Sequence, residues 1–77
     1  MQINLLSFGS LTEVLQSGKI NSLEIMDSNS LKDYLIARHP ELSTKKFLLA
    51  INKNIVQANT VLQEGDTVAV LPPFSGG

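Results

Sequence analysis

Apolar and polar residues alternate at the start of the chain, a pattern typical of a β-strand. Within residues 2–8, Ile3 and Leu5 fall on one face, while Leu6 and Phe8 fall on the other. Successive side chains of a strand point to opposite faces of the sheet. The segment is therefore expected to be a strand that carries apolar groups on both faces near its end.

The next segments predict a short helical turn and a second strand. Residues 10–16 are expected to form one or two helical turns, because Ser10 can cap them and Glu13 follows three positions later. Residues 20–26 predict a strand that is joined to the first by this short connection, so the two strands are expected to pair as a hairpin.

Residues 27–39 carry the strongest helix pattern in the chain. Apolar residues recur at i, i+3 and i+4 from Leu31 onwards, and Asp27 or one of the two serines shortly after it can cap the helix. Pro40 ends the helix, because proline lacks an N–H and disfavours a helical conformation in the residue before it.

The second half of the chain predicts a polar link over residues 41–45 and then three strands. Residues 47–51 are continuously apolar, which favours a central strand that is covered on both faces. A turn at residues 52–54 leads to a short strand at residues 55–56, and residues 67–71 form the last strand. Taken alone, this order of elements supports a small α+β domain.

Composition narrows the possible functions. With 77 residues the chain forms one domain. The net charge of -1, with scattered Lys and Arg, makes nucleic acid and anionic membranes poor partners, and the absence of Cys removes disulfides and thiol chemistry. No signal peptide or membrane-spanning run is recognisable in the sequence, so we expect a cytoplasmic protein.

Catalytic and metal-binding groups are sparse. His39 is the single histidine, so a role at the end of the helix is expected in place of metal binding. Ser75 has no His and Asp companions in a recognisable pattern, and the carboxylates look solvated. The chain is therefore not expected to be an enzyme on its own or to bind a metal.

The final segment is the most informative one. Residues 72–77 are Pro-Pro-Phe-Ser-Gly-Gly, and they follow the Gly65-Asp66 turn and the strand that ends in Leu71. Together with Phe8-Gly9 and Ala-Ile-Asn at residues 50–52, this ending resembles the small-subunit family of molybdopterin synthases, whose members are ubiquitin-like sulfur carriers. The resemblance covers nearly the whole chain.

The resemblance implies a fold and a division of the chain. We expect a β-grasp, ubiquitin-like α+β domain over residues 1–71, with a mixed sheet and one main helix packed on one face. Residues 72–77 are expected to form an extended, flexible C-terminal tail.

The resemblance also implies a chemistry for the C-terminal carboxylate of Gly77. A partner related to ubiquitin-activating enzymes would adenylylate it with ATP and Mg²⁺, and a sulfur donor protein would convert it to a thiocarboxylate. That group would donate sulfur to cyclic pyranopterin monophosphate, which forms the dithiolene of molybdopterin. The large catalytic subunit of molybdopterin synthase would hold the acceptor site, typically in a heterotetramer, and the chain itself would bind no cofactor.

The tail and one face of the sheet supply the candidate contact residues. Glycine has no Cβ and can thread a narrow channel, while proline holds φ nearly fixed and can aim the tail. The residues expected to thread the partner are Pro72, Pro73, Phe74, Ser75 and Gly76. The residues expected to form the partner interface are Leu6, Phe8, Ile55 and Leu71.

Alternatives stay open at this point. Phe8 and Leu71 could equally be core residues, and Phe74 could pack on the domain or enter a partner groove. The chain could carry sulfur for thiamine thiazole synthesis, cysteine synthesis or tRNA thiolation. It could also be a ubiquitin-like interaction module whose tail has no chemical role.

Overall fold

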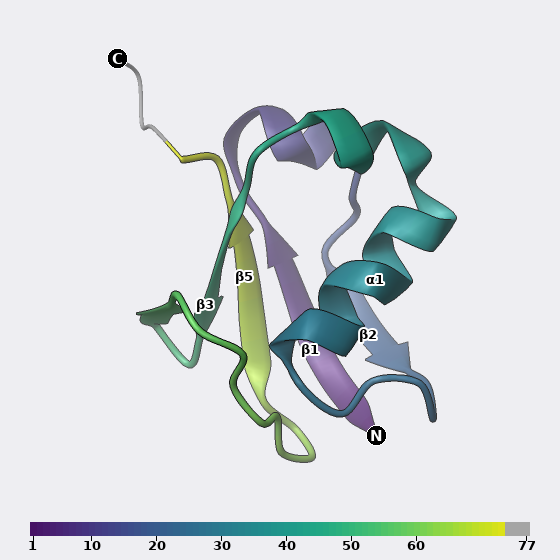
Figure 1. Ribbon diagram of the computed structural model, residues 1–77, viewed down its shortest axis with the longest axis vertical. Helices are drawn as coiled ribbons and strands as arrows, with labels where there is room; N and C mark the ends of the chain where they lie inside the picture. The colour runs from purple at the N-terminus through teal and green to yellow at the C-terminus, as the bar shows by residue number, and fades with distance from the viewer. Residues whose placement is uncertain (74–77) are drawn as a thin grey trace.

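The computed structural model describes residues 1–73, and in these residues five strands form one mixed sheet with an α-helix against one face (Figure 1). The strand order is β2-β1-β5-β3-β4. The strands are β1 (Gln2–Ser7), β2 (Gly18–Asn21), β3 (Leu48–Ile51), β4 (Asn54–Val56) and β5 (Thr67–Leu71). The helices are α1 (Ser28–Arg38) and the 3₁₀ segments η1 (Gly9–Glu13) and η2 (Pro40–Thr44).

The pairing of the strands identifies the topology as a β-grasp. β1 pairs antiparallel with β2 and parallel with β5, and β3 pairs antiparallel with both β4 and β5. The predicted fold class, an α+β β-grasp with one main helix on one face, is confirmed. The expected position of residues 47–51 is wrong, because β5 and not β3 lies at the centre of the sheet. The parallel pairing of β1 with β5 leaves one hairpin on each side of β5.

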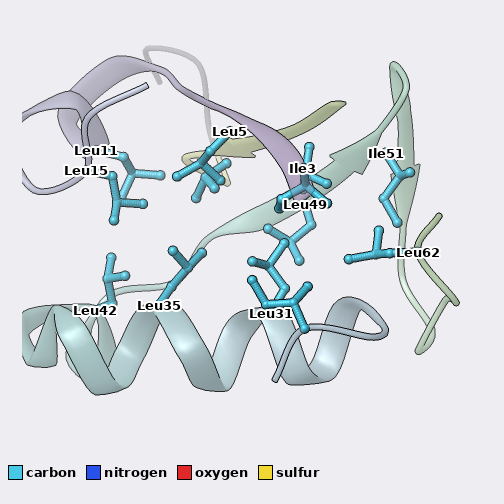
Figure 2. Close-up of a cluster of buried hydrophobic side chains, with 13 residues drawn as sticks. Ile3, Leu5, Leu11, Leu15, Leu31, Leu35, Leu42, Leu49, Ile51 and Leu62 are labelled. Atoms are coloured by element: carbon cyan, nitrogen blue, oxygen red, sulfur yellow. The ribbon is translucent and has the colours of Figure 1, made fainter. Parts of the chain in front are cut away.

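The hydrophobic core lies between the sheet and α1 (Figure 2). Each fully buried aliphatic side chain contributes about 1.5–3 kcal/mol relative to an exposed one. The sheet supplies Ile3, Leu5, Leu49, Ile51, Val68 and Val70. The remaining large contributors are Leu31 and Leu35 of α1, and Leu11, Leu15, Ile25, Leu42 and Leu62 of the connecting segments. The first strand therefore buries the face of Ile3 and Leu5, and the last strand buries the face of Val68 and Val70.

The start of α1 is fixed by a capping box. The Ser30 backbone N–H donates to Asp27 Oδ1 at 2.8 Å, and the Asp27 backbone N–H donates to Ser30 Oγ at 2.9 Å. Of the three candidates, Asp27 is therefore the N-cap. The helix ends at Arg38, directly before His39 and Pro40. With 11 residues, α1 is far shorter than the roughly 20 residues that cross a bilayer, and no helix within residues 1–73 is long and apolar enough to do so.

The predicted strand over residues 20–26 is wrong in its bounds, because β2 is shorter and begins earlier. The Glu24 backbone N–H donates to Ser22 Oγ at 3.0 Å, which turns the chain away from the sheet. Leu23 consequently lies in solvent, whereas Ile25 is buried from a loop. The alternation of apolar residues continues past the strand because this loop also contributes to the core.

The two 3₁₀ segments also differ from the expected structure. No side chain caps η1, so the expected capping role of Ser10 is wrong, although Leu11 is buried as its pattern predicts. The expected polar link over residues 41–45 is largely the segment η2, which Pro40 begins. Leu42 is buried in the middle of η2, and this single apolar residue attaches the connection to the core.

Candidate functional site

The described part of the tail begins beside the corner between β1 and η1. Gly9 has φ +61°, and a Cβ at this position would lie 3.0 Å from Cγ of Pro72. A glycine is therefore favoured here both by the left-handed backbone and by the closeness of the proline ring. Pro72 is half-buried against this corner, and Pro73 is exposed. The contact of Pro72 with Gly9 thus sets the path of the chain after β5, and Gly9 directly follows Phe8.

The face of the sheet opposite α1 carries a row of apolar residues across its centre. Leu6 of β1 is the Cα partner of Ala69 in β5, Ala69 is the partner of Ala50 in β3, and Ala50 is the partner of Ile55 in β4. Paired residues of neighbouring strands point to the same face. Their side chains therefore lie on one face, and the two residues in the middle of the row are small.

These small residues form the floor of a shallow hollow of about 400 Å³, which we call the sheet-face hollow. Its lining residues are Leu6, Phe8, Ala50, Asn52, Lys53, Thr67 and Ala69. Leu6 is 38% exposed and Phe8 is 46% exposed, so two large apolar side chains stand in solvent at its rim. An exposed apolar surface of this kind is typical of a site for another protein.

The polar end of the sheet-face hollow is held in place by Asn52. Its Nδ2 donates to Asp66 Oδ1 at 3.0 Å, and its Oδ1 accepts from the Thr67 backbone N–H at 3.0 Å. Asn52 and Lys53 have φ values of 50° and 76°, so the β3–β4 turn has a positive φ at both central residues. The turn is therefore tied to the start of β5, and the exposed Lys53 is positioned at the edge of the hollow.

The four predicted interface residues lie on this same face. Leu6 and Phe8 line the sheet-face hollow, and Ile55, which is 55% exposed, lies next to it on β4. Leu71 shares the face by strand alternation, but it is half-buried opposite Leu48 and does not line the hollow. The alternative of Phe8 as a core residue is wrong, because nearly half of its surface is exposed.

The predicted site residues of the tail are only partly described. Pro72 and Pro73 follow β5 directly, as the sequence indicates. Phe74, Ser75, Gly76 and Gly77 lie outside the described residues, so the role of each stays a prediction.

The titratable groups of the described residues form no evident reaction centre. Within residues 1–73, no group of three or more His, Asp or Glu side chains is close enough together to hold a metal ion. The pKa of Asp27 is lowered, first by the backbone N–H of Ser30, then by the Ser30 side chain and by Asn59. These bonds belong to the helix cap. The lowered pKa is therefore a feature of the fold and not of the sheet-face hollow.

Several residues of the site could not be identified in the sequence. Ala50 and Ala69 form the floor of the hollow only because β3 and β5 are neighbours in this register. Asn52 and Lys53 were recognisable as turn residues, but their approach to β5 depends on the same pairing. The contact of Gly9 with Pro72 joins residues 63 positions apart in the chain. The one available signal was the glycine directly after a predicted strand.

Comparisons with known proteins agree with this geometry. The model of the ThiS family matches residues 5–77. The chain is 37% identical over 84 residues to the molybdopterin synthase sulfur carrier subunit of Chlamydomonas reinhardtii, with 100% of each protein covered. It is 30% identical over 82 residues to the protein of the same name from Mycobacterium tuberculosis, covering 100% of this chain and 99% of the relative.

A solved structure supports the same fold. It is a chain from the complex of subunits 1 and 2 of the molybdopterin-converting factor of Helicobacter pylori, with a TM-score of 0.74 and 24% sequence identity. The alignment covers 100% of this chain and 100% of that chain.

Proposed function

The chain belongs to the ThiS family, and from this membership we propose that it is the sulfur carrier subunit of a molybdopterin synthase. The observation that carries the proposal is the C-terminal sequence Pro-Pro-Phe-Ser-Gly-Gly at residues 72–77. The family match extends to Gly77, and relatives from Chlamydomonas reinhardtii and Mycobacterium tuberculosis that match over the whole chain are both molybdopterin synthase sulfur carrier subunits.

The proposed reacting group is the C-terminal carboxylate of Gly77. A carboxylate oxygen attacks the α-phosphate of ATP on an activating partner, pyrophosphate leaves, and an acyl-adenylate forms. A sulfur nucleophile from a donor protein then attacks the acyl carbon and AMP leaves. Where this nucleophile is the outer sulfur of a persulfide, a thiol then attacks the donor's inner sulfur, forms a disulfide with it and leaves Gly77 with a thiocarboxylate. The thiocarboxylate is a better nucleophile than the carboxylate, so the tail delivers sulfur to the acceptor without releasing it into solvent.

The folded domain positions the tail for this chemistry. Holding a reactive group in the right place replaces an encounter in solution by a step within one complex. The contact of Pro72 with Gly9 sets where the tail leaves the domain, and the sheet-face hollow lies beside that point through Phe8. A partner that covers the hollow therefore has the root of the tail at the edge of its binding surface.

The partner that holds the pterin acceptor is proposed to be the large subunit of the synthase, in a heterotetramer. The structural relative from Helicobacter pylori is described as a complex of subunits 1 and 2, which supports a two-subunit assembly. On this view the small chain supplies sulfur as a cosubstrate, and the pocket for cyclic pyranopterin monophosphate belongs to the large subunit.

Intact-mass measurement tests the proposal directly. The chain is incubated with its activating enzyme, ATP, Mg²⁺ and a sulfur source, and it should gain the mass difference between one sulfur and one oxygen atom. The modified chain should then convert cyclic pyranopterin monophosphate to molybdopterin in the presence of the large subunit. A variant that lacks Gly77 and a variant with one added residue serve as controls, and neither should gain mass.

The outcome separates the proposed function from its competitors. A chain that gains the mass but supplies sulfur only to a thiazole, cysteine or tRNA acceptor would be a carrier of another pathway. A chain that gains no mass with a working activating enzyme would contradict the carrier function altogether.

A further inference from the structure

A second groove lies among α1, η2 and the start of β3. It has a volume of about 450 Å³, and Pro73 is one of its lining residues. We call it the basic groove, and we define it by three lysines, Lys32, Lys45 and Lys46, around an apolar floor that includes Ile36, Phe47 and Leu48.

The charge of the basic groove differs from that of the whole chain. The chain has six Lys and Arg residues and a net charge of -1, yet half of these six cations surround this one groove. None of its described lining residues is acidic. Lys45 and Lys46 are exposed and Lys32 is half-buried, so the ammonium groups remain close to solvent. A local positive surface on an acidic chain favours a partner segment with carboxylates.

The floor of the basic groove adds an apolar component. Ile36 and Phe47 are partly buried and pack against the core, and Leu48 is half-buried at the start of β3. Interfaces typically combine an apolar centre with a polar or charged rim. The groove therefore fits an acidic segment that carries an aliphatic or aromatic side chain.

The position of the basic groove determines which partner can reach it. Pro73 lines the groove, while the neighbouring Pro72 contacts Gly9 next to Phe8 of the sheet-face hollow. The two surfaces therefore meet at the root of the tail. A protein that takes up the tail from this point passes between them and contacts both.

From this geometry we propose that the basic groove is a second docking site for the large synthase subunit. The large subunit inserts an acidic segment with one apolar anchor, its carboxylates pair with the lysines, and the anchor occupies the floor. The inference rests on the proposed function, because it takes the large subunit as the protein that receives the tail.

The expected energetic contribution is moderate and depends on salt. Exposed ion pairs contribute about 0–1 kcal/mol each, and rim charges act mainly on the association rate. Reversal of the charge of Lys45 or Lys46 by glutamate should slow association with the large subunit several-fold at low ionic strength. The difference should shrink near 1 M salt, where the Debye length is about 3 Å.

The experiment measures the association rate of the full-length chain with the large subunit from the same source at low and high salt. The variants are Lys45→Glu and Lys46→Glu. The matched control is Arg38→Glu, which changes the charge equally at an exposed position that lines neither the basic groove nor the sheet-face hollow. A Lys45→Arg variant keeps the charge and should associate like the wild type. Far-UV circular dichroism confirms that each variant is folded.

The possible results separate this inference from the proposed function. Slower association of the two groove variants only, with convergence at high salt, supports the basic groove. Association equal to that of Arg38→Glu at every salt concentration overturns it and leaves the proposed function intact. Adenylylation of the same variants by the activating enzyme and ATP is measured alongside, and its loss without loss of large-subunit binding assigns the groove to the activating enzyme, which overturns the inference. A wild-type chain that does not bind the large subunit contradicts both.

Discussion

Replacing Gly9 by alanine tests whether the corner between β1 and η1 holds the root of the tail. Gly9 has φ +61°, and the added Cβ would lie 3.0 Å from Cγ and 3.5 Å from Cδ of Pro72. The left-handed backbone costs an alanine about 1–2 kcal/mol. Overpacking typically costs about 1–3 kcal/mol, and the lower end applies here because Pro72 is near the end of the chain. The expected loss is about 2–3 kcal/mol.

Two other glycines separate these contributions. Gly65 has φ +84°, and no atom lies within 4 Å of the place that a Cβ would take, so Gly65→Ala should show the backbone cost alone, about 1–2 kcal/mol. Gly18 has neither a positive φ nor a neighbour within 4 Å of that place. Gly18→Ala should leave the free energy of unfolding unchanged or raise it by about 0.4–1 kcal/mol, because alanine restricts the unfolded chain.

Urea denaturation of the three variants measures the free energies of unfolding. For a domain of this size, each 1 kcal/mol corresponds to about 4–8 °C in Tm, so thermal unfolding gives an independent check. A double-mutant cycle with Pro72→Ala isolates the contact. Without the proline ring, Gly9→Ala should cost no more than Gly65→Ala, which corresponds to a coupling of about 1 kcal/mol.

Equal losses for Gly9→Ala and Gly65→Ala, together with an additive cycle, would refute this reasoning. The result would mean that Pro72 is not held against Gly9, and the tail would then leave the domain without a fixed direction. If the coupling is found, Gly9→Ala should also slow sulfur transfer at saturating large subunit, because the root of the tail is displaced.

Two further predictions concern the sheet-face hollow and the helix cap. Phe8→Asp should weaken binding to the large subunit by about 1–2 kcal/mol, which is roughly 5–30-fold in the Kd measured by calorimetry. The control Leu23→Asp, at a loop side chain that is 94% exposed, should bind like the wild type. Equal affinities of the two variants would exclude Phe8 from the interface. The pKa of Asp27 is lowered from 3.8 by Ser30 and Asn59, so its contribution to stability is present above the unfolded-state pKa and is lost as the pH falls through the folded-state value. Asp27→Asn keeps a capping side chain but cannot titrate, so its free energy of unfolding should fall less steeply than that of the wild type as the pH is lowered. Urea denaturation at several acidic pH values measures this dependence. Identical dependence on pH in the two proteins would contradict the lowered pKa of Asp27 in the helix cap.

Local patterns identified most of the elements because their causes lie within a few residues. The alternation in β1 and β5 follows from burial of one face, which places Ile3 and Val68 in the core. The Asp27 cap and Pro40 bound α1 through interactions of neighbouring residues. The uncovered face, with Leu6 and Phe8, also followed from the alternation in β1.

Features that depend on distant residues could not be predicted in the same way. The central position of β5 arises from its parallel pairing with β1, which joins Asn4 to Thr67. The end of β2 depends on one hydroxyl contact of Ser22, and the burial of Leu42 depends on where η2 meets the core. The basic groove combines a lysine of α1 with two lysines that precede β3, and no sequence spacing brings these together.

The size of the domain explains why the sheet-face hollow and the root of the tail lie side by side. A chain of 77 residues can cover one face of its sheet, and here α1 covers the face of Val68 and Val70. The opposite face of the same central strand carries Ala69, and the described residues leave the sheet-face hollow open there. β5 also leads directly into Pro72. Since β5 supplies Ala69 to the floor of the hollow and leads into the root of the tail, binding energy gained at the hollow would, on the proposed function, position Gly77 within the complex.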